Sequence, residues 1–265
     1  MAHTLAGGSR SARYTDLNLD LPAVITARSE LAACFQLAAL HGLEEGICNH
    51  FSAMVPGRDD LFFVNPYGYA FAEVTADNLL VCDFHGNVVA GEGQPEATAF
   101  YIHARLHKLL PRVKVAFHTH MPHATALCLL QGPPLLWLGQ TALKFYGRTA
   151  VDEDYNGLAL DESEGDRIAS VMGNADVLFL KNHGVIVAGP PIAEAWDDLY
   201  YLERAAQVQL YAMWTGQKIK RIPQPVVDLT MRTIGGPQYG GKPHWEHHFD
   251  ALKRMLDRRE PEYKH

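Results

Sequence analysis

The chain has 265 residues, of which 48% are hydrophobic and 20% charged, and this composition predicts a globular protein with a substantial core. A net charge of -7 argues against a nucleic-acid partner, because phosphate binding needs clustered Lys and Arg. No apolar run is long enough to cross a bilayer, and residues 1–16 lack the apolar segment of a signal peptide, so we expect no membrane partner. The four cysteines have no C-x-x-C spacing and are expected to be reduced thiols of a cytoplasmic protein.

The first predicted element is a helix. Apolar residues recur at helical spacing over 28–40, Thr26 or Ser29 can cap the start, and Gly42 can end the helix. The mixed apolar and polar segment 46–52 that follows is either a strand or a loop that lines a site.

Short apolar runs then predict strands. One is expected over 61–64, and a hairpin with Gly86-Asn87 in its turn is expected over 79–82 and 88–90. A helix follows over 96–110, and Pro111 ends it.

The next strand, over 113–117, leads into His118-Thr119-His120. Since strand side chains alternate between faces, His118 and His120 project to the same side, and such a pair can chelate one metal ion. Pro122 can open the next helix as its first residue, which leaves the histidines at an exposed rim. Taken alone, the pair could equally be two solvated or core histidines.

The rest of the chain predicts four more helices and a strand pair. The strands, over 177–180 and 185–188, flank the tight turn Lys181-Asn182-His183-Gly184. The helices are expected over 122–130, over 161–173 with a capping box at Asp161 and Glu164, and over 190–214. The longest of them should bury Ile192, Ala195, Leu199, Leu202, Ala206, Leu210 and Met213. Segments 132–157 and 216–241 are predicted to be loops, and a terminal amphipathic helix is predicted over 245–258.

This order of elements predicts one α/β domain over residues 21–265, preceded by a flexible arm over 1–20. Its sheet should be mixed or mostly antiparallel. Neither a G-x-G-x-x-G nor a G-x-x-x-x-G-K-[ST] motif occurs, so a dinucleotide or P-loop site is not expected.

The histidines carry the expected chemistry, and fourteen of them is a generous number for this length. A divalent ion needs three or four ligands in a fixed array. His118 and His120 supply two, and His183, held in a tight turn, is the best-placed third. Glu96, at the start of the helix before the ligand strand, is a candidate fourth ligand or catalytic acid/base. Its alternative role is that of a favourable residue in the first turn of a helix.

Two motifs resemble those of the class II aldolase/adducin family. AFHTHMPHATAL, at 116–127, is similar to the H-x-H signature of the family, and LKNHGV, at 180–185, is similar to its second signature, an N-H-G turn that carries the third ligand. The similarity spans roughly residues 28–215. It implies a three-layer α/β/α fold around a largely antiparallel sheet, a divalent metal on His118, His120 and His183, and a tetramer with sites between subunits.

Two departures from the family pattern concern the substrate. Sugar-phosphate aldolases of the family have S-S-E before the ligand strand, where this chain has Gln94-Pro95-Glu96, and an alternative alignment puts Ala99 in the place of the glutamate. The typical phosphate-binding G-N-x-S corresponds to Asn49-His50-Phe51-Ser52. A phosphate cradle needs glycine or small hydroxyl residues, so we expect a substrate without phosphate.

The resemblance therefore implies a divalent-metal-dependent carbon–carbon lyase acting on a small molecule. The leading expectation is decarboxylation of a hydroxylated aromatic carboxylate through a metal-stabilised enolate-like intermediate, with Glu96 or a nearby acid returning the proton. The metal could be Zn, Mn or Fe. Arg148, Lys144 or Arg105 could bind a second carboxylate, although such a residue is more often a surface charge. The alternatives are an aldolase for a small hydroxy-carbonyl compound, a non-haem iron oxygenase acting on a hydroxyphenyl keto acid, and a non-catalytic adducin-like interaction domain.

Overall fold

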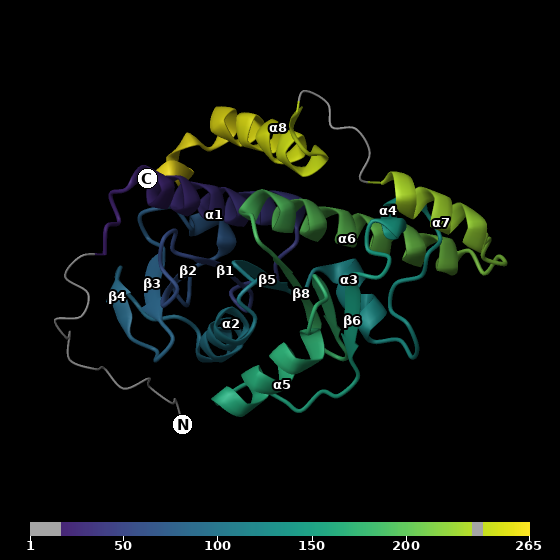
Figure 1. Cartoon of the computed structure of the whole chain (residues 1–265), viewed down its shortest axis with the longest axis horizontal. Coiled ribbons are helices and arrows are strands. Elements are labelled where there is room, and N and C mark those ends of the chain that lie inside the picture. Colours follow the sequence, from purple (N-terminus) through teal and green to yellow (C-terminus); the bar gives the residue numbers. More distant parts are fainter. Residues whose placement is uncertain (1–16, 235–240) are drawn as a thin grey trace.

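A computed structural model describes residues 17–234 and 241–265, and eight strands within them form one sheet (Figure 1). The strands are β1 His50–Met54, β2 Leu61–Val64, β3 Leu80–Asp83, β4 Val88–Ala90, β5 Val115–Thr119, β6 Thr149–Asp152, β7 Val177–Leu180 and β8 Gly184–Gly189. Their order is β4-β3-β2-β1-β5-β8-β7-β6, and every neighbouring pair is antiparallel except β6 with β7. The predicted mixed, largely antiparallel sheet is confirmed.

Helices cover both faces of this sheet. They are α1 Pro22–His41, α2 Ala97–Leu109, α3 Pro122–Cys128, α4 Gln140–Leu143, α5 Glu162–Met172, α6 Ile192–Trp214, α7 Gln224–Thr233 and α8 His244–Arg259, with short 3-10 segments η2 Phe71–Glu73 and η4 Pro261–Lys264. In Figure 1, α1 and α6 lie on one side of the strands and α2 and α5 on the other. The predicted three-layer α/β/α arrangement is therefore confirmed.

Strand β5 divides its side chains between these two layers. Phe117 packs in the cluster that contains residues of α1 and α6, whereas Ala116 packs in the cluster that contains residues of α2 and α5. Because alternate strand residues share a face, His118 lies on the α2 side of the sheet.

Helix α1 begins six residues before the predicted start, at Pro22, whose fixed φ suits the first helical position. The predicted caps were wrong: the N-cap is Leu21, without a side-chain hydrogen bond, and the Thr26 hydroxyl donates to the Pro22 carbonyl instead. Gly42 ends the helix as predicted, with a left-handed φ of 63°.

Contrary to the expectation from the sequence, α1 is long and apolar enough to span a membrane by length and composition, with a mean hydropathy of 1.3. A buried helix of a globular fold meets the same criterion. Leu31, Phe35 and Leu37 of α1 are fully buried in the main hydrophobic cluster.

Three elements lie in segments predicted to be loops. Strand β6 and helix α4 are short, with four residues each, and β6 is half-buried at the sheet edge, so neither has a clear periodic pattern. Helix α7 follows Pro223 and has Pro225 in its first turn. Proline is tolerated there, so residues that suggested a helix breaker in fact mark a helix start.

The C-terminal helix α8 packs on α1 and α6 of its own chain, and Figure 1 shows it outside that layer. Phe249 and Leu256 anchor it in the main core. The predicted buried stripe of α6 holds as far as Ala206, but Leu210 is half-buried and Met213 is 39% exposed.

The predicted arm over residues 1–20 falls mostly outside the described residues, since 1–16 are not among them. Its last part packs on the fold, because Leu17 and Leu19 contact the main hydrophobic cluster.

Candidate metal centre

The three predicted histidines converge at one end of the paired strands β5 and β8. His118 is on β5, His120 follows the end of β5, and His183 lies in the turn between β7 and β8. The antiparallel pairing places His118 opposite Ile186 and Thr119 opposite Val185. The end of β5 therefore lies beside the start of β8, and the turn residue His183 meets the H-x-H pair.

The three imidazoles form a nearly equilateral group. Their ring centroids are 4.7 Å apart for His118 and His183, 4.9 Å for His120 and His183, and 5.0 Å for His118 and His120. One nitrogen from each ring lies within 4.8 Å of those from the other two. Divalent metals bind imidazole nitrogens at about 2.0–2.1 Å, so small side-chain adjustments would bring all three onto one ion.

Two of the rings have their proton positions fixed by a second partner. His118 Nδ1 donates to the Val185 carbonyl at 3.0 Å, and His120 Nδ1 donates to the Glu45 carboxylate at 2.6 Å. Since both partners only accept hydrogen bonds, each ring in its neutral form has an unprotonated Nε2 that can bind a metal. These two Nε2 atoms lie 3.1 Å apart, an arrangement that a shared cation relieves. The donor set therefore fits a divalent ion.

Burial keeps the ligands in the form that binds metal. It lowers the pKa of His118 well below its usual value, with further lowering from His183 and other neighbouring histidines. Burial, followed by the effect of His120, lowers the pKa of His183 to about 4. Neutral imidazole is the metal-binding form, so both rings can bind a metal near neutral pH without losing a proton.

The turn that presents His183 depends on two special residues. Asn182 has a left-handed φ of 59°, a conformation that asparagine tolerates better than most residues. A Cβ on Gly184 would lie 2.6 Å from the Thr119 carbonyl oxygen and 2.8 Å from His120 Cδ2. Glycine at 184 therefore allows β8 to pass directly against the end of the H-x-H strand.

Glu45 is a site residue that the sequence did not indicate. Its carboxylate contacts His120, and its backbone N–H donates to Asn49 Oδ1, which also accepts a hydrogen bond from the His120 backbone. Glu45 and His120 are 75 positions apart, and no local pattern connects them.

Glu96 lies at the start of α2 as its N-cap. Its carboxylate accepts hydrogen bonds from the Ala99 N–H at 2.8 Å and from the Thr98 hydroxyl. Glu96 therefore has the helix-start role that the sequence left open as its alternative. The ligand group formed by the three histidines does not include it. Ala99, its substitute in the other alignment, is buried and has no carboxylate.

We expect Glu96→Gln to weaken the cap by about 1 kcal/mol and to leave metal content unchanged, because the carboxylate holds the helix start. Thermal unfolding and metal analysis of the purified variant measure both effects. Turnover of the same variant tests the acid/base role, and a rate close to that of the unchanged protein would remove Glu96 from the reaction.

The basic residues considered for a second substrate carboxylate are all paired within the fold. Lys144 contacts Asp197 and Asp198, and Arg148 contacts Asp176 and Asp198. Arg105 pairs with two acidic residues of α5, Glu162 and Asp166. These pairs link α4, α6 and α5 to their neighbours, so each cation already has partners that a substrate would have to displace.

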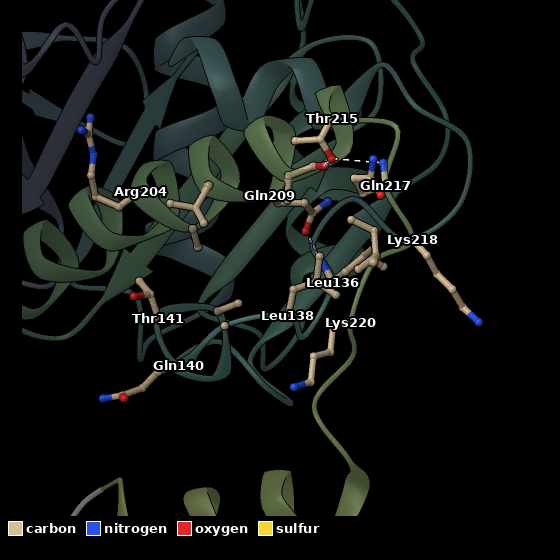
Figure 2. A pocket seen from close by; sticks show the side chains of 16 residues that line it. Leu136, Leu138, Gln140, Thr141, Arg204, Gln209, Thr215, Gln217, Lys218 and Lys220 are labelled. Atoms are coloured by element: carbon tan, nitrogen blue, oxygen red, sulfur yellow. Dashed lines mark hydrogen bonds between the residues drawn. The ribbon is translucent and has the colours of Figure 1, made fainter.

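Two cavities have different relations to the histidines. One, of about 40 Å³, borders His183 and is also lined by Thr98, Tyr155 and Arg167. A larger one, of about 470 Å³, lies between α6 and segments 136–142 and 217–220, and none of the three histidines lines it (Figure 2). The smaller cavity is therefore the one connected to the metal centre.

Comparisons with known proteins agree with the fold and the motifs. Residues 29–210 match the family model of the class II aldolase and adducin N-terminal domain. A Pseudomonas aeruginosa protein assigned provisionally to aldolase class 2 is 34% identical over 244 residues, which cover 89% of this chain and 91% of that protein. The decarboxylase NovR of Streptomyces niveus is 31% identical over 218 residues, covering 81% of this chain and 79% of NovR. The crystal structure of an aldolase II superfamily protein from Pseudomonas syringae superposes with a TM-score of 0.85 at 31% identity, covering 92% of this chain and 97% of that one.

Proposed function

Because this chain belongs to the class II aldolase/adducin family, we propose that it is a divalent-metal-dependent carbon–carbon lyase with the metal on His118, His120 and His183. The convergence of the three imidazoles, with the Nε2 atoms of His118 and His120 3.1 Å apart, is the observation that carries the proposal. Zn, Mn or Fe would suit these ligands. A non-catalytic adducin-like domain would have no need to retain them.

A divalent ion bound there would act as a Lewis acid and stabilise the negative charge that develops on substrate oxygens when a carbon–carbon bond breaks. Val185 and Glu45 hold the ligand rings in the required orientation. Thr98 at the cavity wall donates to Glu96, which stays the proposed acid that returns a proton to the substrate carbon.

We propose a substrate without phosphate. The segment that corresponds to the phosphate-binding sequence of sugar-phosphate aldolases carries bulky side chains where a phosphate cradle needs glycine or small hydroxyl residues. Asn49 Oδ1 accepts from two backbone N–H groups, His50 hydrogen-bonds His103, and Phe51 packs among Phe35, Phe71 and Phe117.

The proposed reaction is decarboxylation of a hydroxylated aromatic carboxylate, and the similarity to the Streptomyces decarboxylase supports it. Cleavage of a small hydroxy-carbonyl compound is the second candidate, favoured by the aldolase members of the family.

We further propose a cytoplasmic homotetramer. Val208, Tyr211 and Trp214 are exposed on successive turns of α6, and this apolar surface supports the oligomer, because a contiguous apolar patch is typical of an interface.

Anaerobic assay of CO2 release tests this function. Hydroxylated aromatic acids are offered to the protein stripped of metal and then reloaded with Zn, Mn or Fe(II). We expect CO2 release only with added metal, and aldehyde release from hydroxy-carbonyl compounds would favour the second candidate. Oxygen consumption with Fe(II) and a hydroxyphenyl keto acid, without anaerobic turnover, would favour an oxygenase. A protein that neither binds nor needs a divalent ion would overturn the enzyme proposal.

A further inference from the structure

Four polar side chains form a continuous row of hydrogen bonds between β1 and α2, next to the metal centre. His50 and Ser52 belong to β1, and His103 and His107 belong to α2. His50 Nδ1 lies 2.7 Å from His103 Nε2, the Ser52 hydroxyl contacts His103 Nδ1, and the same hydroxyl lies 2.7 Å from His107 Nε2. The far end of the row is the Val113 carbonyl, 2.8 Å from His107 Nδ1.

These side chains are shielded from water, since none is more than 5% exposed. No carboxylate of the described residues contacts any of them, and burial lowers the pKa of His107 to about 4 and that of His103 well below its usual value. The rings are therefore neutral near pH 7, and each carries a single N–H proton.

The carbonyl at the far end sets the direction of every bond in the row. A carbonyl only accepts, so His107 Nδ1 carries the proton and its Nε2 must accept from the Ser52 hydroxyl. The Ser52 hydroxyl also lies 3.5 Å from the Ala116 carbonyl, but His107 Nε2 is the closer acceptor at 2.7 Å. With its proton directed there, Ser52 Oγ accepts from His103 Nδ1. His103 Nε2 in turn accepts from His50 Nδ1.

His50 is consequently held with its proton on Nδ1 and an unprotonated Nε2. Among the described residues, the hydrogen bond of the His50 ring is made through Nδ1, to His103. His50 and His118 are directly opposite each other on β1 and β5, and their rings lie 4.8 Å apart. His50 is not part of the group of nitrogens that converge for one ion. Its free acceptor therefore lies beside the metal centre without belonging to it.

We propose that His50 is a substrate-binding residue whose Nε2 accepts a hydrogen bond from a substrate hydroxyl, and that Ser52, His103 and His107 are positioning residues that fix its tautomer. This rests on the proposed function and narrows it: the substrate carries a free hydroxyl close to the group that the metal binds. An ether at that position has no proton to donate and leaves the acceptor unpaired.

The tautomer is measured directly by 15N NMR of the full chain labelled in histidine, which needs neither activity nor a substrate. We expect His50 to be a single Nδ1–H tautomer, Ser52→Ala to give a mixture, and Ser52→Thr to restore the single form. Cys82→Ala, a buried change outside the row, is the matched control and should leave the spectrum of His50 unchanged. An Nε2–H tautomer in the unchanged protein, or no effect of Ser52→Ala, would overturn the proposal.

Binding of two probes to the metal-loaded protein tests the substrate contact. We expect 2-hydroxybenzoate to bind about tenfold more tightly than 2-methoxybenzoate, and His50→Phe to remove this difference without lowering metal content. His50→Gln, which keeps an amide donor and an acceptor, should restore part of it. Equal binding of the probes to the unchanged protein would overturn the proposal, as would loss of metal in His50→Phe, which would make His50 a ligand. Neither binding result depends on CO2 release. Failure of the proposed lyase activity can therefore be distinguished from failure of the proposed His50 contact.

Discussion

His183→Ala is expected to remove the bound divalent ion and to lower turnover by at least about 100-fold. Loss of a residue that merely orients a ligand costs about 10–100-fold in metal affinity or activity, and loss of a ligand costs more. Within the described part of the chain His183 supplies one of three converging nitrogens, so two of these ligands would remain. His118→Ala and His120→Ala should behave alike. Metal content after gel filtration and initial rates with metal added back measure the effect.

A graded series gives this prediction its controls. Glu45→Ala removes the partner of His120 but keeps all three ligands, so metal affinity should fall by only about 10–100-fold. His85→Ala removes an exposed histidine from the β3–β4 turn and should change nothing. Full metal content in His183→Ala would show that the ion, if any, binds elsewhere.

Gly184→Ala is expected to damage the metal centre without changing any ligand. The added methyl group would lie 2.6 Å from the Thr119 carbonyl oxygen and 2.8 Å from His120 Cδ2, so β5 and β8 must separate. Forced overpacking of this kind costs about 1–3 kcal/mol of stability. We expect that loss in denaturant unfolding, together with weaker metal binding measured by calorimetry.

Gly189→Ala is the matched control, because Gly189 is at the other end of the same strand. A Cβ there would have an ordinary contact of 3.7 Å with the Ala195 side chain. Its stability and metal affinity should stay close to those of the unchanged protein. If the two variants behave alike, close approach at Gly184 is not what shapes the site.

Local sequence signals predicted the parts of the site that are formed by neighbouring residues. The H-x-H pair at a strand end and the N-H-G turn are short patterns, and the structure brings His118, His120 and His183 together. The helix start at Asp161 was also predictable, because its carboxylate accepts from two nearby backbone N–H groups.

The remaining site contacts join residues that are distant in sequence. Glu45 meets His120 across 75 positions, and His50 meets His103 across 53. Periodicity specifies which face of a strand is buried, but it does not say which side chain of another element will meet it. The same limitation explains why β6 was missed, since the strand that pairs with it, β7, begins 25 residues after the end of β6.

The register between β5 and β8 has a thermodynamic consequence. It brings the turn that holds His183 to His118 and His120, which are more than 60 positions earlier, so an unfolded chain offers no three-nitrogen site. An ion that binds only the folded chain shifts the folding equilibrium by mass action. At a free concentration 100 times the dissociation constant, this linkage contributes about 2.7 kcal/mol. Chelation would then lower the unfolding temperature in proportion to the logarithm of the free metal concentration. The metal concentration would thus control both the folded fraction of the protein and its turnover rate.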